Sequence, residues 1–163
     1  MAIVHPEGWR ELAASGAAGR EIETLTRLAE GLSDDYTVFH GVHWTRVRNG
    51  GFAIVGEIDF AIVGPTGKLL LIEQKSGFLA ETPEGLVKRY AKKDKSVPQQ
   101  LARSVDALSQ RLRAVCGDDP VFVDALLFCP DYVVKQPGTA GLDPAPALAL
   151  LERLPPGARP GRV

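Results

Sequence analysis

The sequence predicts an α/β fold in which a mixed β-sheet is flanked by helices. Residues 16–31 and the segment that begins near Pro98 carry apolar side chains at helical spacing. Between them, residues 36–75 contain three segments rich in aliphatic, β-branched and aromatic side chains, separated by glycine turns, which is typical of strands. A nearly continuous apolar run, residues 121–128, comes last. The order helix, strands, helix, strand favours an α/β arrangement.

The first helix is expected over residues 16–31, since Gly31 suits a helix end. Its apolar stripe is expected to be Ile22, Leu25, Ala29 and Leu32. Three strands are expected to follow, over residues 36–43, 52–63 and 68–75. The turns between them are expected at residues 49–51 and 64–67.

The next elements are expected to be a short hairpin and a second helix. Residues 78–81 and 86–91 predict the hairpin strands, joined by residues 82–85. The helix is expected to begin near Pro98, a residue favoured in a first turn. Its buried stripe is expected to be Leu101, Val105, Leu108 and Leu112. Residues 121–128 predict a strand in the interior of the sheet.

One domain is expected to span residues 1–135. Residues 136–163 are rich in proline and glycine and are expected to form a C-terminal extension or linker, with one weak helix over residues 146–154.

The composition is that of an ordinary globular protein. The 163 residues are 45% hydrophobic and 24% charged, which excludes a disordered, collagen-like or coiled-coil chain. No apolar run reaches the length of a membrane span and the N-terminus shows no secretion signal, so a cytoplasmic location without membrane contact is expected. Cys116 and Cys129 indicate neither a disulfide framework nor a structural zinc site. Because the net charge is only −1, any nucleic-acid binding would have to depend on local clusters of positive charge.

Charged side chains interrupt the second and third predicted strands. If residues 65–67 form a three-residue hairpin loop, Asp59 lies opposite Glu73. Glu57 then lies opposite Lys75, and all four side chains share one face of the sheet. A two-residue loop would instead place Asp59 and Glu73 on opposite faces, so the prediction depends on the loop.

Two half-buried carboxylates that face each other repel, and a hard divalent cation removes the conflict. The four charges of Glu57, Asp59, Glu73 and Lys75 sum to −2, which matches one such ion. Lys75 would lie beside the ion. The alternative is a solvated sheet face, with an ion pair between Glu57 and Lys75 and the other two carboxylates relaxed apart in water.

At these residues the sequence resembles the nuclease-related domain (NERD) family of the PD-(D/E)xK nuclease superfamily. Residues 56–59 (GEID) are similar to one element of the family, and residues 72–75 (IEQK) are similar to its I-E-x-K element. Ile58 stands where the nominal proline of the superfamily would be. The resemblance covers about residues 16 to 130 and implies a restriction-endonuclease-like core.

The resemblance implies a nuclease that uses Mg²⁺ or Mn²⁺ to hydrolyse phosphodiester bonds in DNA, with RNA as a further substrate left open. Asp59 and Glu73, with the backbone carbonyl of Gln74, would hold the metal ion. Lys75 would orient the attacking water or stabilise charge on the phosphate. Glu57 would contact the metal's outer coordination sphere.

The resemblance also implies an acidic residue on the first helix and a glutamine at the start of the following helix. Glu21 is the better candidate for the first, because it borders the apolar stripe and Glu23 points away. Glu21 would bind the metal through water. Gln100 fits the second role, with Gln99 as an adjacent competitor. A solvated helix face is the alternative for each of these side chains.

Residues 88–95 carry five positive charges and one negative. Beside a phosphodiesterase site this segment could bind a nucleic-acid backbone, with Tyr90 available to stack on a base. The alternative is a solvated loop. The residues expected to bind nucleic acid are Lys88, Arg89, Lys92 and Lys93.

Other patterns carry less chemistry. Residues 64–68 lack the flanking residues of a phosphate-binding loop, which excludes that nucleotide site. The three histidines lack metal-ligand spacing and are expected to be structural, although His43 and Trp44 could line a groove. The histidines are His5, His40 and His43.

The alternative to an enzyme is a non-catalytic nucleic-acid-binding or adaptor module with a nuclease fold. Because the family is often joined to helicases or other DNA-processing modules, the chain is expected to be the N-terminal module of a larger protein, fused to or associated with a helicase.

Overall fold

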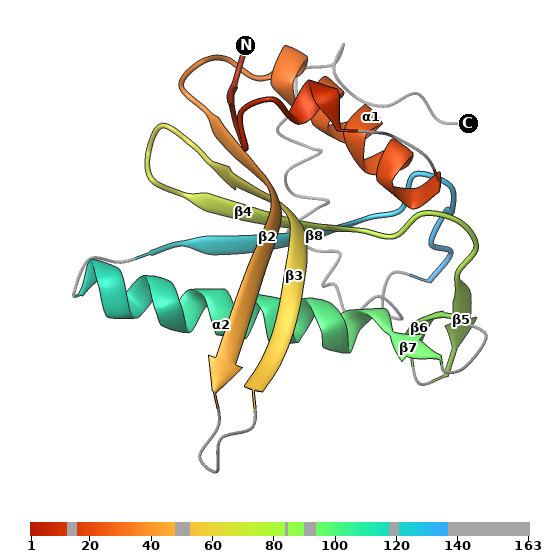
Figure 1. Ribbon diagram of the computed structural model, residues 1–163. Helices are drawn as coiled ribbons and strands as arrows, with labels where there is room; N and C mark the ends of the chain where they lie inside the picture. The colour runs from red at the N-terminus through yellow and green to blue at the C-terminus, as the bar shows by residue number, and fades with distance from the viewer. Residues whose placement is uncertain (13–15, 48–52, 84, 90–93, 118–120, 137–163) are drawn as a thin grey trace. The chain divides into compact units, whose positions relative to one another are not determined.

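The computed structural model describes residues 1–12, 16–47, 53–83, 85–89, 94–117 and 121–136 (Figure 1). The chain divides into two compact units. The first contains residues 1–78 and 99–133, and the second contains residues 79–98 and 134–163. The predicted turn at residues 49–51 and the predicted helix over residues 146–154 lie outside the described residues.

The first unit is built on a mixed five-stranded sheet in the order β1-β2-β3-β4-β8. The strands β2, β3 and β4 are antiparallel neighbours, whereas β1 is parallel to β2 and β8 is parallel to β4. The predicted α/β fold with a mixed sheet is confirmed. The strand bounds are Ile3–His5 (β1), Thr37–Val47 (β2), Ala53–Val63 (β3), Leu69–Gln74 (β4) and Val123–Phe128 (β8).

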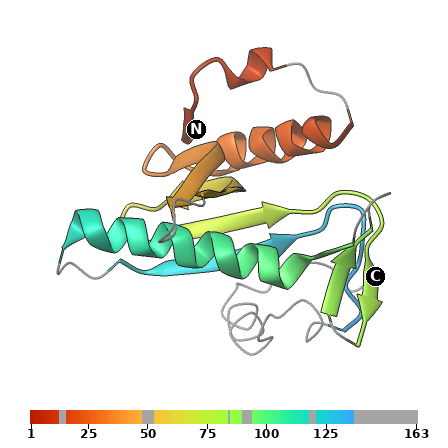
Figure 2. The ribbon, with the colours of Figure 1, turned by 60° about the horizontal axis from the view of Figure 1, so that its bottom comes forward.

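Two helices accompany this sheet. The helix α1, Gly16–Gly31, has the predicted bounds, and α2 runs over Val97–Cys116. In both views β4 lies between the two helices (Figures 1 and 2). A short 3-10 helix, Trp9–Glu11, precedes them. No described helix is both long enough and apolar enough to cross a membrane.

The hydrophobic core gathers side chains of α1 and of the central strands. It includes the predicted stripe residues Leu25 and Ala29, both almost fully buried. The stripe of α2 differs from the prediction, because Leu101 is buried but Val105, Leu108 and Leu112 are only half-buried. The other buried positions of α2 are Val97, Ser104 and Ala107, two of them small.

The strand predicted over residues 121–128 is real, but its predicted place inside the sheet is wrong. The strand β8 is the last in the sheet order and pairs with β4 alone among the described strands. Asp124 and Leu126 are exposed, whereas Leu127 is buried. This strand is therefore only partly buried, although its sequence is almost continuously apolar.

The second unit contains a three-stranded antiparallel sheet in the order β5-β6-β7. Its strands are Ala80–Thr82 (β5), Gly85–Lys88 (β6) and Lys95–Ser96 (β7). The pairing of β5 with β6 confirms the predicted short hairpin, but Thr82 and Gly85, predicted to lie in its loop, belong to the strands and pair with each other.

Candidate functional site

The candidate site lies where β3 and β4 separate. The hairpin has the predicted three-residue loop, with Gly67 at φ 76° and the Gly64 N–H bonded to the Lys68 carbonyl at 2.9 Å. The predicted register also holds from Val63 opposite Leu69 to Phe60 opposite Ile72.

Beyond Phe60 the two strands no longer pair, so the predicted direct pairing of Asp59 with Glu73 is wrong. The strand β4 continues with β8, whereas β3 continues with β2. The Asp59 side chain spans the opening, because its Oδ2 accepts a hydrogen bond of 2.6 Å from the backbone N–H of Gln74. Asp59 Oδ2 thus occupies the place of the backbone carbonyl oxygen that would accept this hydrogen bond if the two strands continued to pair.

Asp59 has an unusually high pKa of about 7. Burial of the carboxylate is the main cause, and the negative charge of Glu73 adds to it. The hydrogen bond from the Gln74 N–H and the charge of Lys75 act in the opposite direction. Asp59 is therefore a carboxylate that gains from a nearby cation.

This pKa predicts how stability depends on pH in the absence of divalent ions. The folded-state pKa lies above the ordinary aspartate value of 3.8, so the stabilisation that Asp59 contributes is complete below about pH 4 and is lost as the pH rises through about 7. The loss amounts to at most ~4 kcal/mol at 1.36 kcal/mol per pKa unit. Urea unfolding in EDTA at pH 5 and pH 8 measures the part of this loss that falls between the two pH values, at most ~3 kcal/mol.

The comparison variant is Asp59→Asn, which has no titrating group at this position. From pH 5 to pH 8, we expect the free energy of unfolding of the native protein to fall relative to that of Asp59→Asn. Asp124→Asn, on the exposed face of β8, controls for the loss of one carboxylate. Equal pH dependence for the native protein and Asp59→Asn would contradict the assigned pKa.

Glu73 is a buried carboxylate with one satisfied oxygen and one unsatisfied oxygen. Its side chain is 1% exposed. Oε1 accepts hydrogen bonds from Lys75 Nζ and, at 2.6 Å, from Gln100 Nε2. Oε2 has no hydrogen-bond partner among the described residues. Burial raises the pKa of Glu73, and the neighbouring Lys75 opposes the rise.

Lys75 turns toward Glu73 and not toward Glu57. Lys75 is 9% exposed, and its Nζ also lies 3.4 Å from the Gln74 carbonyl oxygen. Glu57 is exposed and lies 3.7 Å from the ring of His43. The predicted pairing of Glu57 with Lys75 is therefore wrong, because the strands separate before they reach these residues. The burial of Glu73 and Lys75 also excludes the alternative of a solvated sheet face for this pair.

The helix α1 adds a third acidic side chain. The Glu21 Oε2 lies 3.4 Å from His40 Nε2, and its charge raises the pKa of both Asp59 and Glu73. Glu23 is exposed and pairs with Arg20 on its own helix. The structure thus brings Glu21, and not Glu23, close to the two carboxylates.

His40 is the residue of this site that the sequence analysis missed. It was expected to be structural, and it does stack on Phe60 with the ring centroids 5.4 Å apart. Its contact partner, Glu21, lies 19 positions away in the sequence, and no sequence motif links the two residues. The available signal was the register of β2, which places His40 opposite Phe60, the residue that follows Asp59 in β3.

Gln100 reaches the site because α2 is fixed against the β2–β3 ribbon. The Trp44 indole donates a hydrogen bond of 3.3 Å to Ser104 Oγ, and that hydroxyl donates one of 3.3 Å to the Glu57 carbonyl. Trp44 packs over Gly56, its partner in the ladder. Gln100 lies one helical turn before Ser104, whereas Gln99 is exposed.

The predicted basic segment belongs to the second unit. Lys88 is half-buried in β6 and Arg89 is exposed. The other expected nucleic-acid ligands, Lys92 and Lys93, lie with Tyr90 outside the described residues.

The donor atoms fit a hard cation. The unsatisfied Glu73 Oε2, the Asp59 carboxylate and the Gln74 carbonyl are oxygen donors. Within the described ranges, no group of three or more His, Cys, Asp or Glu side chains is arranged to hold a metal. Two carboxylates and a carbonyl suit Mg²⁺ or Mn²⁺, ions that keep several water ligands, and do not suit a closed zinc site.

Comparison with known proteins agrees with this geometry. Searches of curated proteins and of solved structures found no match. The family model described as "Nuclease-related domain" matches residues 15–130, a range that contains α1, the separating strands β3 and β4, and Gln100 on α2. With this match over more than two thirds of its length, the chain belongs to the nuclease-related domain family.

Proposed function

We propose that this protein is a Mg²⁺- or Mn²⁺-dependent nuclease that hydrolyses phosphodiester bonds in DNA. The observation that carries the proposal is the state of Glu73. One of its oxygens is held by Lys75 and Gln100, while the other, equally buried, has no partner among the described residues. A buried carboxylate oxygen without a donor is costly unless a ligand satisfies it.

Asp59, Glu73 and the Gln74 carbonyl would hold the metal ion. When bound there, the ion would polarise the scissile phosphate and activate a water molecule. Gln100 and Lys75 fix the orientation of Glu73, so that its free oxygen keeps one direction. The Gln74 N–H fixes Asp59 in the same way. The donors are thus preorganised before substrate arrives.

Lys75 provides positive charge at the site. Its ammonium group is buried between Glu73 Oε1 and the Gln74 carbonyl. In surroundings poor in water, this charge would stabilise the negative charge that develops on the phosphate during hydrolysis. It would also orient the attacking water by a hydrogen bond.

Glu21 and Glu57 have supporting roles in this proposal. Glu21, held by His40, would bind the metal through water. Glu57 is exposed and would act only through outer-sphere contacts. Lys88 and Arg89, with Lys92 and Lys93, would bind the nucleic-acid backbone.

We further propose that the substrate is met in the cytoplasm and that a helicase is fused to or associated with this domain. The sequence contains two cysteines, Cys116 and Cys129, and no disulfide framework, which fits a reducing compartment. The alternative substrate is RNA. Parallel cleavage assays on DNA and on RNA distinguish the two possibilities.

Plasmid nicking across a Mg²⁺ titration tests the proposal. We expect relaxed plasmid to accumulate with Mg²⁺, EDTA to abolish it, and Lys75→Ala to slow it about 10²–10³-fold. Lys68→Ala removes an exposed lysine of the same hairpin and is expected to nick at the native rate. Thermal unfolding of each variant checks that it is folded.

Two results would overturn the nuclease proposal. Metal binding by the native protein without cleavage would favour a non-catalytic adaptor. Nicking that folded Lys75→Ala and Lys68→Ala perform equally well would show that the activity arises elsewhere.

A further inference from the structure

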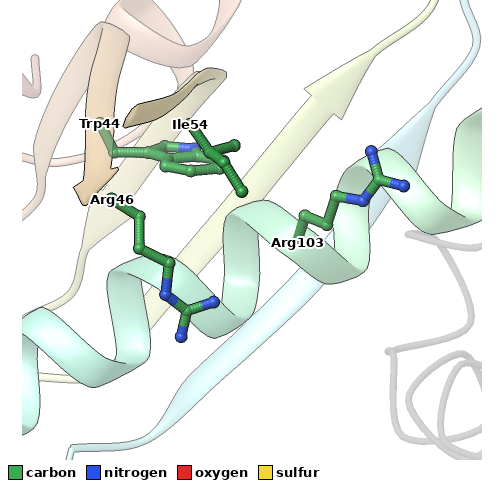
Figure 3. Close-up of a pocket in the computed structure, with 4 residues that line it drawn as sticks. All are labelled: Trp44, Arg46, Ile54 and Arg103. Carbon is green, nitrogen blue, oxygen red and sulfur yellow. The ribbon is translucent and has the colours of Figure 1, made fainter. Parts of the chain in front are cut away.

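A pocket of about 330 Å³ lies between the β2–β3 ribbon and α2 (Figure 3). Trp44 and Arg46 line it from β2, Ile54 from β3 and Arg103 from α2. None of these four side chains belongs to the carboxylate site described above.

The walls of the pocket leave only guanidinium groups for polar recognition. Trp44 is 6% exposed, and its indole N–H is already bonded to Ser104. Ile54 offers only an apolar surface. A ligand of this pocket would therefore meet Arg46 and Arg103, which form charge-assisted and often bidentate hydrogen bonds to phosphate.

The charge around the pocket is positive. Asp106 pairs with Arg46 at 3.0 Å and holds its guanidinium in place together with Gln110. Arg103 forms no hydrogen bond or ion pair with the described part of the chain. Arg111, two turns farther along α2, donates to the Thr45 carbonyl at 2.6 Å. The lining of the pocket itself thus contains two arginines and no carboxylate, which favours an anionic ligand.

The pocket lies close to the carboxylates along two elements. Arg103 follows Gln100 by three residues, a rise of about 4.5 Å along the helix, and Gln100 contacts Glu73. Ile54 and Asp59 are five residues apart on β3, about 16 Å of extended strand. A nucleic-acid strand covers about 16 Å in roughly five nucleotide steps.

We infer that this pocket binds the sugar–phosphate backbone of the nucleic acid, within about five nucleotides of the bond that is cleaved. The inference rests on the proposed nuclease function and adds a contact surface in the first unit. Because the Trp44 ring is buried and its N–H is occupied, no base is stacked or read here. The contact is to phosphate and is independent of base sequence.

Arg103→Gln and Arg113→Gln form a matched pair for the test. Each removes one exposed arginine from α2, but Arg113 does not line this pocket and lies about 15 Å farther along the helix. The probe is a fluorescent duplex of about 20 base pairs, bound in Ca²⁺ and followed by anisotropy between about 50 and 200 mM salt.

We expect Arg103→Gln to weaken binding about tenfold at the lower salt concentration. Its slope of log affinity against log salt is expected to fall by about 1, equally for an AT-rich and a GC-rich duplex. Arg113→Gln is expected to keep the native affinity and slope. In nicking assays, the loss for Arg103→Gln is expected in KM and not in kcat.

Equal affinities and salt slopes for the two variants would overturn the inference, and so would a loss confined to one base composition. The native protein separates this failure from failure of the proposed function. If it binds and nicks DNA while Arg103→Gln behaves like Arg113→Gln, only the pocket assignment is wrong. If it neither binds nor nicks, both are wrong.

Discussion

Asp59→Asn is expected to reduce plasmid nicking about 10³-fold and, in the same preparation, to raise the stability of the metal-free protein at pH 8. The asparagine oxygen can still accept the hydrogen bond from the Gln74 N–H, so the fold keeps this link. The variant loses the charge that burial and Glu73 disfavour. It also loses the charge that would bind the metal. The two readouts are therefore expected to move in opposite directions.

Thermal unfolding with and without Mg²⁺ completes this experiment. A ligand that binds only the folded state stabilises it, so Mg²⁺ is expected to raise the Tm of the native protein but not that of Asp59→Asn. Glu23→Gln, a change of the same kind at an exposed position of α1, is expected to behave like the native protein. Native nicking rates in Asp59→Asn would remove Asp59 from the catalytic mechanism.

Gly56→Ala is expected to lower the free energy of unfolding by ~3 kcal/mol, the upper end of the usual cost of overpacking. A Cβ at Gly56 would lie 2.2 Å from Trp44 Cζ2 and 2.4 Å from Cε2. The indole is a rigid ring, it is buried, and its N–H is bonded to Ser104, so it cannot move aside without breaking other contacts. In a protein of this size, the expected fall in Tm is about 6–12 °C.

The matched control for Gly56→Ala is Gly31→Ala, at the end of α1. A Cβ at Gly31 meets nothing within 4 Å, and the effect is expected to stay within ~0.5 kcal/mol. Removing the indole in the double variant Gly56→Ala with Trp44→Leu is expected to cost less than the sum of the two single changes. Additive costs would show that the ring is not what excludes a side chain at residue 56.

Local rules predicted the elements on which the site is built. The period of the apolar residues located α1 with its exact bounds, because one face of that helix packs on the core. The loop chemistry of Gly67 fixed the register of the hairpin. From that register and the resemblance, the acidic residues and Lys75 could be named before their surroundings were known.

The contacts inside the site could be identified only from the tertiary structure. No local rule signals that β4 leaves β3 after Ile72 to continue with β8, so the predicted direct pairing extends three residues too far. The contact of His40 with Glu21 depends on how α1 packs. The packing of Trp44 over Gly56 could not be predicted either, because a glycine in a strand can equally indicate a bulge or a bend.

The hydrogen bond from the Gln74 amide to Asp59 couples the architecture of the sheet to its chemistry. Elsewhere in the ladder the acceptor is a carbonyl, whose electron density hardly varies with the solution. Here the acceptor gains or loses a full charge when a proton or an ion arrives. The amide proton of Gln74 is therefore a built-in spectroscopic probe, whose resonance reports the occupancy of the neighbouring carboxylate without any added label.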